Sequence, residues 1–265
     1  MSKISSEKLI LVIREPDGIA TVTINRPASL NSLTQLMITD LAHAFKVLGR
    51  DESVRVIVLT GSGRAFCSGL DLTAAEQIFK ADMKGNESDP VSHMEQCPKP
   101  IIGAINGAAV TAGFEIALAC DILVAAEGTK FIDTHTRFGI VPSWGLSQKL
   151  ARIIGPNKAR EVSLTAKPLT AEEAQKLGFV NYVVPETELM KKAREIAAAI
   201  AKNNHEIVIR YKSMINEGFK LDLHQALALE KERAHKFYRI MTTEQFEKMK
   251  NFVAIRSSKK LSSKL

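Results

Sequence analysis

The pattern of hydrophobic and polar positions near the start of the chain predicts a hairpin followed by a helix and a buried strand. Residues 9–14 and 19–24 are apolar and rich in β-branched side chains, and the Glu, Pro, Asp and Gly of residues 15–18 separate them. Turn-forming residues between two such runs are typical of a β-hairpin. Residues 32–48 carry apolar side chains at helical spacing, and residues 54–59 are apolar apart from Arg55, which predicts a buried strand.

Strand and helix patterns continue to alternate in the middle of the chain. Short apolar runs predict three further strands, at residues 101–105, 122–125 and 130–132. Residues 112–119 are predicted to form a helix. This alternation favours an α/β architecture over separate helical and sheet halves. From residue 147 onward the pattern is almost wholly helical, with long helices predicted at residues 186–201, 205–217 and 223–238.

Composition changes this picture little, but the charge is unevenly distributed. The chain has 265 residues, of which 45% are hydrophobic and 25% charged, as in ordinary globular proteins. Its formal net charge is +7, and residues 247–265, with six basic and one acidic side chain, supply +5 of it. The rest of the chain is nearly neutral, which argues against a nucleic-acid-binding body.

Cysteine usage and hydropathy argue against a disulfide-bonded protein and against a membrane-inserted one. Three cysteines are an odd number and too few for a disulfide framework, so reduced thiols inside the cell are expected. The apolar stretch at residues 101–120 has the length of a membrane span but contains Asn106 and Glu115. A buried strand followed by a helix fits this stretch better, and we expect no membrane insertion.

The final tripeptide carries a targeting signal. Ser263, Lys264 and Leu265 form the carboxyl-terminal sequence that peroxisomal import receptors recognise. The preceding residues are polar and suited to capture by such a receptor. The sequence therefore predicts a peroxisomal location.

Several common catalytic motifs are missing. Gly61 and Gly63 follow a predicted strand, but the third glycine of a dinucleotide-binding fingerprint would fall on Phe66. Ser68 does not stand in a G-x-S-x-G elbow, because Phe66 precedes it by two residues. There is also no phosphate-binding P-loop and no H-E-x-x-H zinc motif.

Two glycine-containing segments are more informative. In residues 62–72 and 104–121, small residues follow a predicted strand and lead into a predicted helix. Backbone N–H groups are left without partners at such places, and two that converge on one carbonyl oxygen make an oxyanion hole. Alternatively, the glycines only permit tight turns and close packing. Glu115 has apolar neighbours, so it is expected to be buried rather than exposed, and a buried carboxylate requires a reason.

These segments resemble the crotonase superfamily, in particular the enoyl-CoA hydratases. The similarity extends over about residues 9–256 and is greatest to plant-type monofunctional peroxisomal members. Five motifs carry it in order, at residues 24–33 (INRPASLNSL), 63–72 (GRAFCSGLDL), 104–121, 138–142 and 169–174.

The resemblance implies an α/β fold, a crotonase-like spiral of ββα units with a helical carboxyl-terminal oligomerisation region. Residues 1–203 would form the core with the active site, residues 204–256 the helical region, and residues 257–265 a flexible tail. Helices of this family pack on neighbouring subunits, so a homotrimer or homohexamer is expected.

The resemblance also implies a reaction, the reversible syn addition of water to a trans-2-enoyl-CoA. Backbone N–H groups of Leu70 and Ala112 would form the oxyanion hole, and Glu115 would be the first catalytic glutamate. The second glutamate position falls on His135, which departs from the family pattern. His135 could orient water or move a proton, Asp133 could supply the carboxylate, or Glu115 could act alone. No metal or cofactor is expected, because coenzyme A is part of the acyl-CoA thioester substrate.

Other residues are assigned to substrate binding by the same resemblance. Trp144 either lines the acyl pocket or packs in the core, and Lys99 is a further candidate for a phosphate contact. Candidate CoA and substrate contacts are Arg26, Ala28, Ser68, Asp71, Leu72, Trp144, Phe252 and Arg256.

Two alternative functions stay open. A hydratase-lyase or thioesterase on aromatic or branched acyl-CoA would use the same oxyanion hole, with Phe79, Met83 and Trp144 deciding the substrate. A crotonase-fold RNA-binding or scaffold protein would instead use the basic tail, and its RNA binding would depend on salt.

Overall fold

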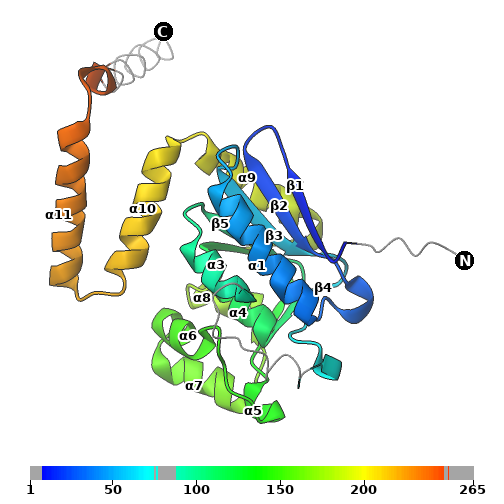
Figure 1. Cartoon of the computed structure of the whole chain (residues 1–265). Coiled ribbons are helices and arrows are strands. Elements are labelled where there is room, and N and C mark those ends of the chain that lie inside the picture. Colours follow the sequence, from blue (N-terminus) through cyan, green and yellow to red (C-terminus); the bar gives the residue numbers. More distant parts are fainter. Residues whose placement is uncertain (1–7, 75, 77–87, 248–249, 251–265) are drawn as a thin grey trace, which may run out of the picture. The chain divides into compact units, whose positions relative to one another are not determined.

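The computed structural model describes residues 8–74, 76, 88–247 and 250 (Figure 1). The chain divides into two units, Met1–Ile209 and Arg210–Leu265. The boundary expected from the sequence lies between residues 203 and 204. In its described part, the first unit contains two β-sheets and most of the helices.

A six-stranded sheet forms the larger layer of the first unit. The first two strands are an antiparallel hairpin, as predicted, and all other neighbours in the sheet are parallel. Gly18 in the hairpin turn has φ +82° and donates its N–H to the carbonyl of Glu15 at 3.1 Å. In spatial order the strands are β1 (Ile10–Arg14), β2 (Ile19–Ile24), β3 (Val56–Gly61), β5 (Ile101–Ile105), β7 (Ile122–Ala126) and β10 (Tyr182–Val184).

A second, smaller sheet consists of short strands. In spatial order these are β4 (Ala65–Cys67), β6 (Ala108–Val110), β8 (Lys130–Ile132) and β9 (Leu169–Thr170). The first three are parallel, and β9 runs antiparallel to β8. Three times in succession, a strand of the large sheet is followed by one of the small sheet, as β3–β4, β5–β6 and β7–β8. This is the predicted spiral of ββα units.

The expectation of an almost wholly helical chain after residue 147 is wrong in detail. β9 and β10 lie in this region, and β4 and β6 were also not predicted. These strands have two or three residues, too few for an alternating pattern to be recognised. The helices of this region and the shorter ones before it are α3 (Pro90–Gln96), α5 (His135–Phe138), α6 (Leu146–Ile154), α7 (Pro156–Thr165) and α8 (Ala171–Lys176).

Two longer helices begin a few residues later than predicted. Helix α1 (Gln35–Arg50) starts after Thr34, whose hydroxyl accepts a hydrogen bond from the N–H of Met37 at 3.3 Å. A threonine in this position ends the preceding loop and satisfies a free N–H group of the first turn. Helix α9 (Leu189–Ala201) follows a single 3-10 turn, Glu186–Glu188.

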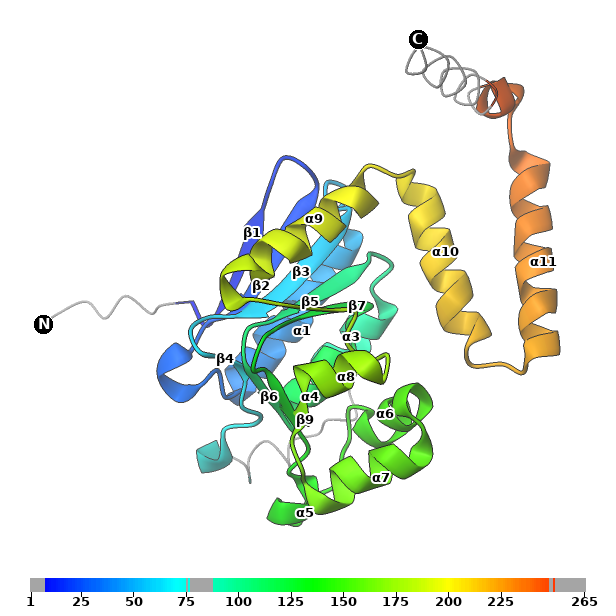
Figure 2. The same ribbon diagram turned by 180° about the vertical axis from the view of Figure 1, so that it is seen from behind.

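Apolar packing on both faces of the large sheet forms the core. Every residue of β3 and β5 is buried. Figure 2 shows α9 across one face, where Ala193 and Ala197 lie in a buried cluster with Val58 and Ile102. The core cluster of the other face includes α1 and α4 (Ala112–Leu118). Burial on both faces explains why these strands read as continuous apolar runs.

The second unit is helical in its described part. It contains most of α10 (His205–Gly218) and all of α11 (Leu223–Ile240), which confirms the two helices predicted here. Arg233 donates a hydrogen bond to the Ser213 hydroxyl at 3.0 Å, and the Arg210 guanidinium lies 5.1 Å from the Phe237 ring centre. Among the described residues, no helix is both long and apolar enough to cross a membrane.

Candidate active site

A buried carboxylate lies at the centre of the first unit. Glu115 is on α4, a helix whose seven residues are all buried, and only 3% of Glu115 is exposed. Its Oε1 atom accepts the backbone N–H of Trp144 at 2.8 Å and that of Leu146 at 3.3 Å. Two amide donors thus compensate part of the cost of burying a carboxylate and fix its orientation.

The second carboxylate oxygen of Glu115 points toward an imidazole. Oε2 of Glu115 lies 4.0 Å from Nε2 of His135, and Nδ1 of His135 lies 2.7 Å from Oδ1 of Asp133. The same Oδ1 accepts the backbone N–H of His135 at 3.1 Å. All three side chains are buried. We call Glu115, His135 and Asp133 the Glu–His–Asp triad.

The two carboxylates of the triad are in different electrostatic environments. Burial raises the pKa of Glu115, and its hydrogen bonds with Trp144 and Leu146 and the nearby His135 oppose this only in part. Burial also acts to raise the pKa of Asp133, but its hydrogen bonds with His135 and Ser163 outweigh it and lower that pKa. Asp133 is therefore favoured as an anion, whereas the raised pKa of Glu115 makes this carboxylate better suited to accept and release a proton.

Aromatic packing brings the triad together. Phe114, the neighbour of Glu115 on α4, has its ring centre 5.4 Å from that of Phe131 on β8. Phe179 contacts both rings, at 5.4 Å and 4.8 Å between centres. Asp133 directly follows β8, so this contact between α4 and β8 sets the position of Glu115 relative to Asp133 and its neighbour His135.

The two predicted oxyanion donors belong to neighbouring segments, the loop after β4 for Leu70 and the start of α4 for Ala112. The N–H of Leu33 donates to Gly69 at 2.8 Å and the N–H of Asp71 donates to Leu33 at 2.9 Å, so Leu70 itself forms no hydrogen bond in this bridge. Ala112 is the first residue of α4. Within the part of the chain that the structure describes, neither the Leu70 N–H nor the Ala112 N–H donates to an acceptor.

Two glycines allow the backbones of these loops to meet. A Cβ atom on Gly113 would lie 2.2 Å from the carbonyl oxygen of Cys67, which no side chain can occupy. Gly69 has φ +102°, and a Cβ there would lie 3.1 Å from the Val110 carbonyl oxygen. The glycines are thus required for close packing, and this packing brings the loop of Leu70 next to the start of α4 at Ala112. An oxyanion hole in these segments and a packing role for their glycines are therefore compatible interpretations.

Thr111, just before Ala112, has an unusual backbone conformation. Its φ is +50° and ψ is −106°, although it is β-branched. A residue of this type with positive φ is strained unless its surroundings hold it. The N–H of Thr111 donates to Ile132 at 2.8 Å, and its hydroxyl is hydrogen bonded to that of Thr134. Sequence reasoning did not identify Thr111 or Thr134, since no motif indicates this contact.

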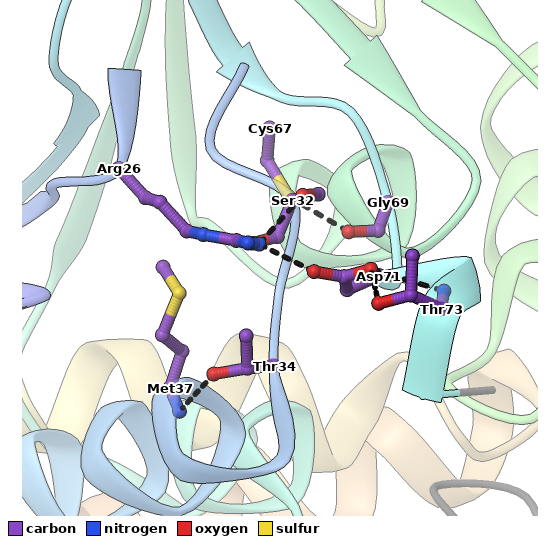
Figure 3. A network of polar contacts seen from close by, with 8 residues as sticks. All are labelled: Arg26, Ser32, Thr34, Met37, Cys67, Gly69, Asp71 and Thr73. Carbon is purple, nitrogen blue, oxygen red and sulfur yellow. Dashed lines mark hydrogen bonds and ion pairs between the residues drawn. The ribbon is translucent and has the colours of Figure 1, made fainter. Parts of the chain in front are cut away.

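Arg26 and Asp71 form an ion pair beside the Leu70 loop (Figure 3). Arg26 donates to Asp71 at 2.6 Å and to the Ser32 hydroxyl at 3.0 Å. Hydrogen bonds from Thr73, followed by that from Arg26, lower the pKa of Asp71 to about 2.

Burial raises the pKa of the Cys67 thiol to about 12, so this residue is not a reactive nucleophile.

Two buried or half-buried asparagines hold the loops around this pair. The Asn31 amide donates to the carbonyls of Ser62 at 2.8 Å and Ala65 at 2.7 Å. The Asn106 amide donates to Gly63 at 2.6 Å, and its oxygen accepts the N–H of Gly61 at 3.1 Å. Both asparagines lie within motifs that the sequence analysis identified. Their place in these motifs was the only sign in the sequence that they hold the loops.

The remaining predicted residues lie in different environments. Ala28 and Leu72 are exposed, Ser68 is half-buried, and Trp144 is buried. Lys99 is buried, and its ammonium donates to the carbonyls of Asp51 and Val54, so it is held by the protein rather than presented to a phosphate. Predicted residues outside the described part of the chain are Phe79, Met83, Phe252, Arg256, Ser263, Lys264 and Leu265.

Comparison with known proteins agrees with this architecture. The profile of the family described as enoyl-CoA hydratase/isomerase matches residues 14–258. The chain therefore belongs to the enoyl-CoA hydratase/isomerase family, and the resemblance found in its motifs is confirmed.

Individual relatives extend over nearly the whole chain. A protein of Arabidopsis thaliana named probable enoyl-CoA hydratase 1, peroxisomal, is 67% identical over 265 residues, which is 100% of both chains. The short-chain-enoyl-CoA hydratase of Clostridium acetobutylicum is 36% identical over 83% of this chain and 87% of its own. The crystal structure of an enoyl-CoA hydratase from Bacillus anthracis has a TM-score of 0.82 and 33% identity, and the match covers 93% of this chain and 96% of that one.

Proposed function

We propose that this protein is an enoyl-CoA hydratase, which adds water reversibly and syn to a trans-2-enoyl-CoA to give a 3-hydroxyacyl-CoA in fatty-acid β-oxidation. The observation that carries the proposal is the buried Glu115 carboxylate. One of its oxygens is held by two backbone N–H groups, and the other points to His135. A fixed carboxylate with a raised pKa is suited to activate a water molecule. The names of the relatives from Clostridium and Bacillus support the same reaction.

In this reaction the Leu70 and Ala112 N–H groups bind the thioester carbonyl oxygen. Negative charge develops on that oxygen as the bond between the α and β carbons takes up water and an enolate forms. Removal of one such donor from an oxyanion hole raises the barrier by about 3 kcal/mol. Hydration transfers protons and oxygen without a net change of redox state, so the protein's own groups suffice and coenzyme A enters only as part of the substrate.

The nucleotide part of coenzyme A is proposed to lie beside the Arg26–Asp71 pair. Ser68 and Leu72 flank Leu70 on the same loop, and Ala28 is close to Arg26 in the chain. Trp144 is proposed to close the acyl pocket. Its backbone N–H donates to the Glu115 carboxylate, which places this residue next to the proposed catalytic group. Phe252 and Arg256 complete the proposed set of contacts.

We further propose that the second unit mediates assembly into a homotrimer or homohexamer. None of the side chains of α11 is buried, although several are large and apolar. Exposed apolar residues of this unit include Tyr211, Ile215, Phe219, Leu223, Leu227, Tyr238 and Ile240. Such a surface is typical of a protein interface. Sedimentation of the intact protein should give the mass of three or six chains, and a monomer would contradict the proposal.

The proposed location is the peroxisome. The Arabidopsis relative, whose name includes this compartment, and the tripeptide Ser263, Lys264 and Leu265 support it. A fluorescent protein fused to the amino terminus should enter peroxisomes with the intact chain, and removal of Leu265 should leave it in the cytosol. Identical distributions of the two fusions would contradict the proposal.

Hydration is tested with purified protein and crotonyl-CoA, by following loss of the absorbance of the conjugated thioester. Glu115→Gln should lower kcat by about 10³-fold, because an amide cannot accept the proton of water. Glu186→Gln is a matched control, since this glutamate is exposed and forms no ion pair with any described residue. Absence of hydration by the wild-type protein, or an unchanged rate in Glu115→Gln, would refute the proposal.

A further inference from the structure

We propose that His135 is the second catalytic group of this enzyme and that Asp133 is a positioning residue that acts through it. The inference rests on the proposed hydratase function and deepens it. It replaces a pair of catalytic carboxylates with a carboxylate and an imidazole, and it assigns different tasks to the two acidic side chains of the triad.

The hydrogen bonds of Asp133 determine which imidazole nitrogen is available. Oδ1 of Asp133 accepts from the backbone N–H of His135 at 3.1 Å and lies 2.7 Å from its Nδ1. A carboxylate is an acceptor only, so Nδ1 carries the proton. Nε2 is then the nitrogen that faces Glu115, and the ring cannot rotate without losing its bond to Asp133.

Asp133 itself is poorly placed to act on substrate. Its carboxylate is occupied by His135 and by the side chain of Ser163, and it lies on the Nδ1 side of the ring whereas Glu115 lies on the Nε2 side. The imidazole therefore separates the two carboxylates. Asp133 influences the reaction by holding His135, as the orienting acid of a catalytic triad does.

The space between Glu115 and His135 suits one water molecule. Their facing atoms, Oε2 and Nε2, are 4.0 Å apart, too far for a direct hydrogen bond. A water molecule beside this gap can lie within hydrogen-bond distance of both atoms. Because the other oxygen of Glu115 is already bound to two N–H groups, Oε2 is the oxygen left for this water.

The proton transfers balance with these two groups. Glu115 accepts a proton from water as the water oxygen bonds to the β carbon, and the electron pair of the double bond moves toward the thioester as an enolate. The proton on Glu115 passes to the free Nε2 of His135, which then gives it to the α carbon. Both groups are restored by this transfer, and the net change is addition of one water. The reverse sequence dehydrates the product.

Two measurements separate these roles. The first is kcat and KM for crotonyl-CoA. The second is the exchange of the C2 hydrogens of butyryl-CoA with deuterium oxide, which reports proton transfer at the α carbon in a thioester that cannot be hydrated. His135→Gln should lower both kcat and exchange by about 10³-fold. Butyryl-CoA binding within twofold of the wild type would show that the site is intact, and His135→Asn provides the same test if the glutamine variant does not fold.

The role of Asp133 is tested by its own variants. Asp133→Asn should lower kcat by about 10- to 100-fold with little change in KM, and Asp133→Glu should recover part of the loss. The double variant Asp133→Asn with His135→Gln should be no slower than His135→Gln alone, because Asp133 acts through the imidazole. Multiplied losses in the double variant would overturn the positioning role. Wild-type kcat in His135→Gln would overturn the catalytic role, whereas an inactive wild-type protein would instead refute the hydratase proposal.

Discussion

Two helices of this protein obtain their stability in opposite ways. Helix α4 has seven residues, and all of them are buried. Helix α11 has eighteen residues, and none of them is buried. Its first turn is capped by Asp222, which accepts the N–H of Gln225 at 2.9 Å, and Lys236 pairs with Glu232 four residues earlier at 2.6 Å. Local contacts of this kind stabilise a helix only weakly.

The difference indicates where catalytic precision comes from. A helix as short as α4 is unstable in isolation, so packing alone holds it and thereby fixes Glu115 against His135. Helix α11 holds no residue of the triad, and its exposed apolar side chains are available to another copy of the chain. We thus propose that the rigid catalytic site and the assembly surface belong to separate parts of the molecule.

The largest expected effect comes from removing one aromatic ring from α4 and one from the second unit, at Phe219 just before α11. Phe114→Ala should lower the free energy of unfolding by about 3–5 kcal/mol, because the ring is fully buried. Phe219→Ala should change it by less than about 0.5 kcal/mol in the monomer, because 68% of this side chain is exposed. Urea denaturation measures both, and sedimentation should show weakened assembly only for Phe219→Ala. Equal losses of stability in the two variants would remove the contrast between the regions.

A smaller effect is expected from a single methyl group. Gly113→Ala places a Cβ within 2.2 Å of a backbone oxygen, and overpacking of this kind costs about 1–3 kcal/mol. Gly49→Ala is the control. Residue 49 lies within α1, and a Cβ atom there would have ordinary contacts at 3.5 Å. Alanine there should stabilise the protein by up to about 1 kcal/mol. Thermal unfolding of both variants tests this, and equal melting temperatures would contradict it.

Loss of the Thr134 hydroxyl should affect activity more than stability. Thr134→Val removes the hydrogen bond that holds Thr111 in its strained conformation, so the adjacent Ala112 N–H is no longer fixed. We expect kcat to fall by about tenfold, since small displacements of an oxyanion donor are costly. Thr39→Val, on the exposed side of α1, should retain wild-type kcat. Full activity of Thr134→Val would show that Thr111 does not position the donor.

The smallest effect concerns the Arg26–Asp71 pair at acid pH. The pKa of Asp71 is lowered from 3.8 to about 2 in the folded protein. The hydrogen bonds that Asp71 accepts from Thr73, followed by that from Arg26, therefore stabilise the fold fully above about pH 4, and this contribution is lost as the pH falls through 2. Asp71→Asn should melt slightly below the wild type at pH 7, and the two proteins should converge near pH 2. A difference that is independent of pH would mean that the charge of Asp71 does not contribute.

The sequence predicted the long elements of the fold because their patterns are long. β3 and β5 are continuous apolar runs, and α10 and α11 have clear helical periodicity, so all four were found. The missed strands β4, β6, β9 and β10 are held mainly by pairing with strands distant in the chain. A two- or three-residue strand has no period of its own, and its existence depends on its partner.

The candidate site was predicted in part. Glu115 was proposed mainly through the family resemblance, and its apolar neighbours predicted its burial. The same resemblance directed attention to Leu70 and Ala112. The backbone donors of Trp144 and Leu146 were not found, because a main-chain N–H leaves no trace in residue identity. Thr111 and Thr134 were missed for a related reason, since their bond joins positions 23 residues apart.

By itself, the sequence determined the alternation of strands and helices, which follows from local periodicity. Its motifs indicated the family by resemblance, and the same resemblance made Glu115 the candidate catalytic carboxylate. Only the tertiary structure decided that Asp133 lies behind His135 rather than beside Glu115, and that one oxygen of Glu115 is already occupied. Such facts depend on the directions of side chains from separate elements, which are set by packing around Phe114 and Phe131 and by backbone hydrogen bonds between distant loops.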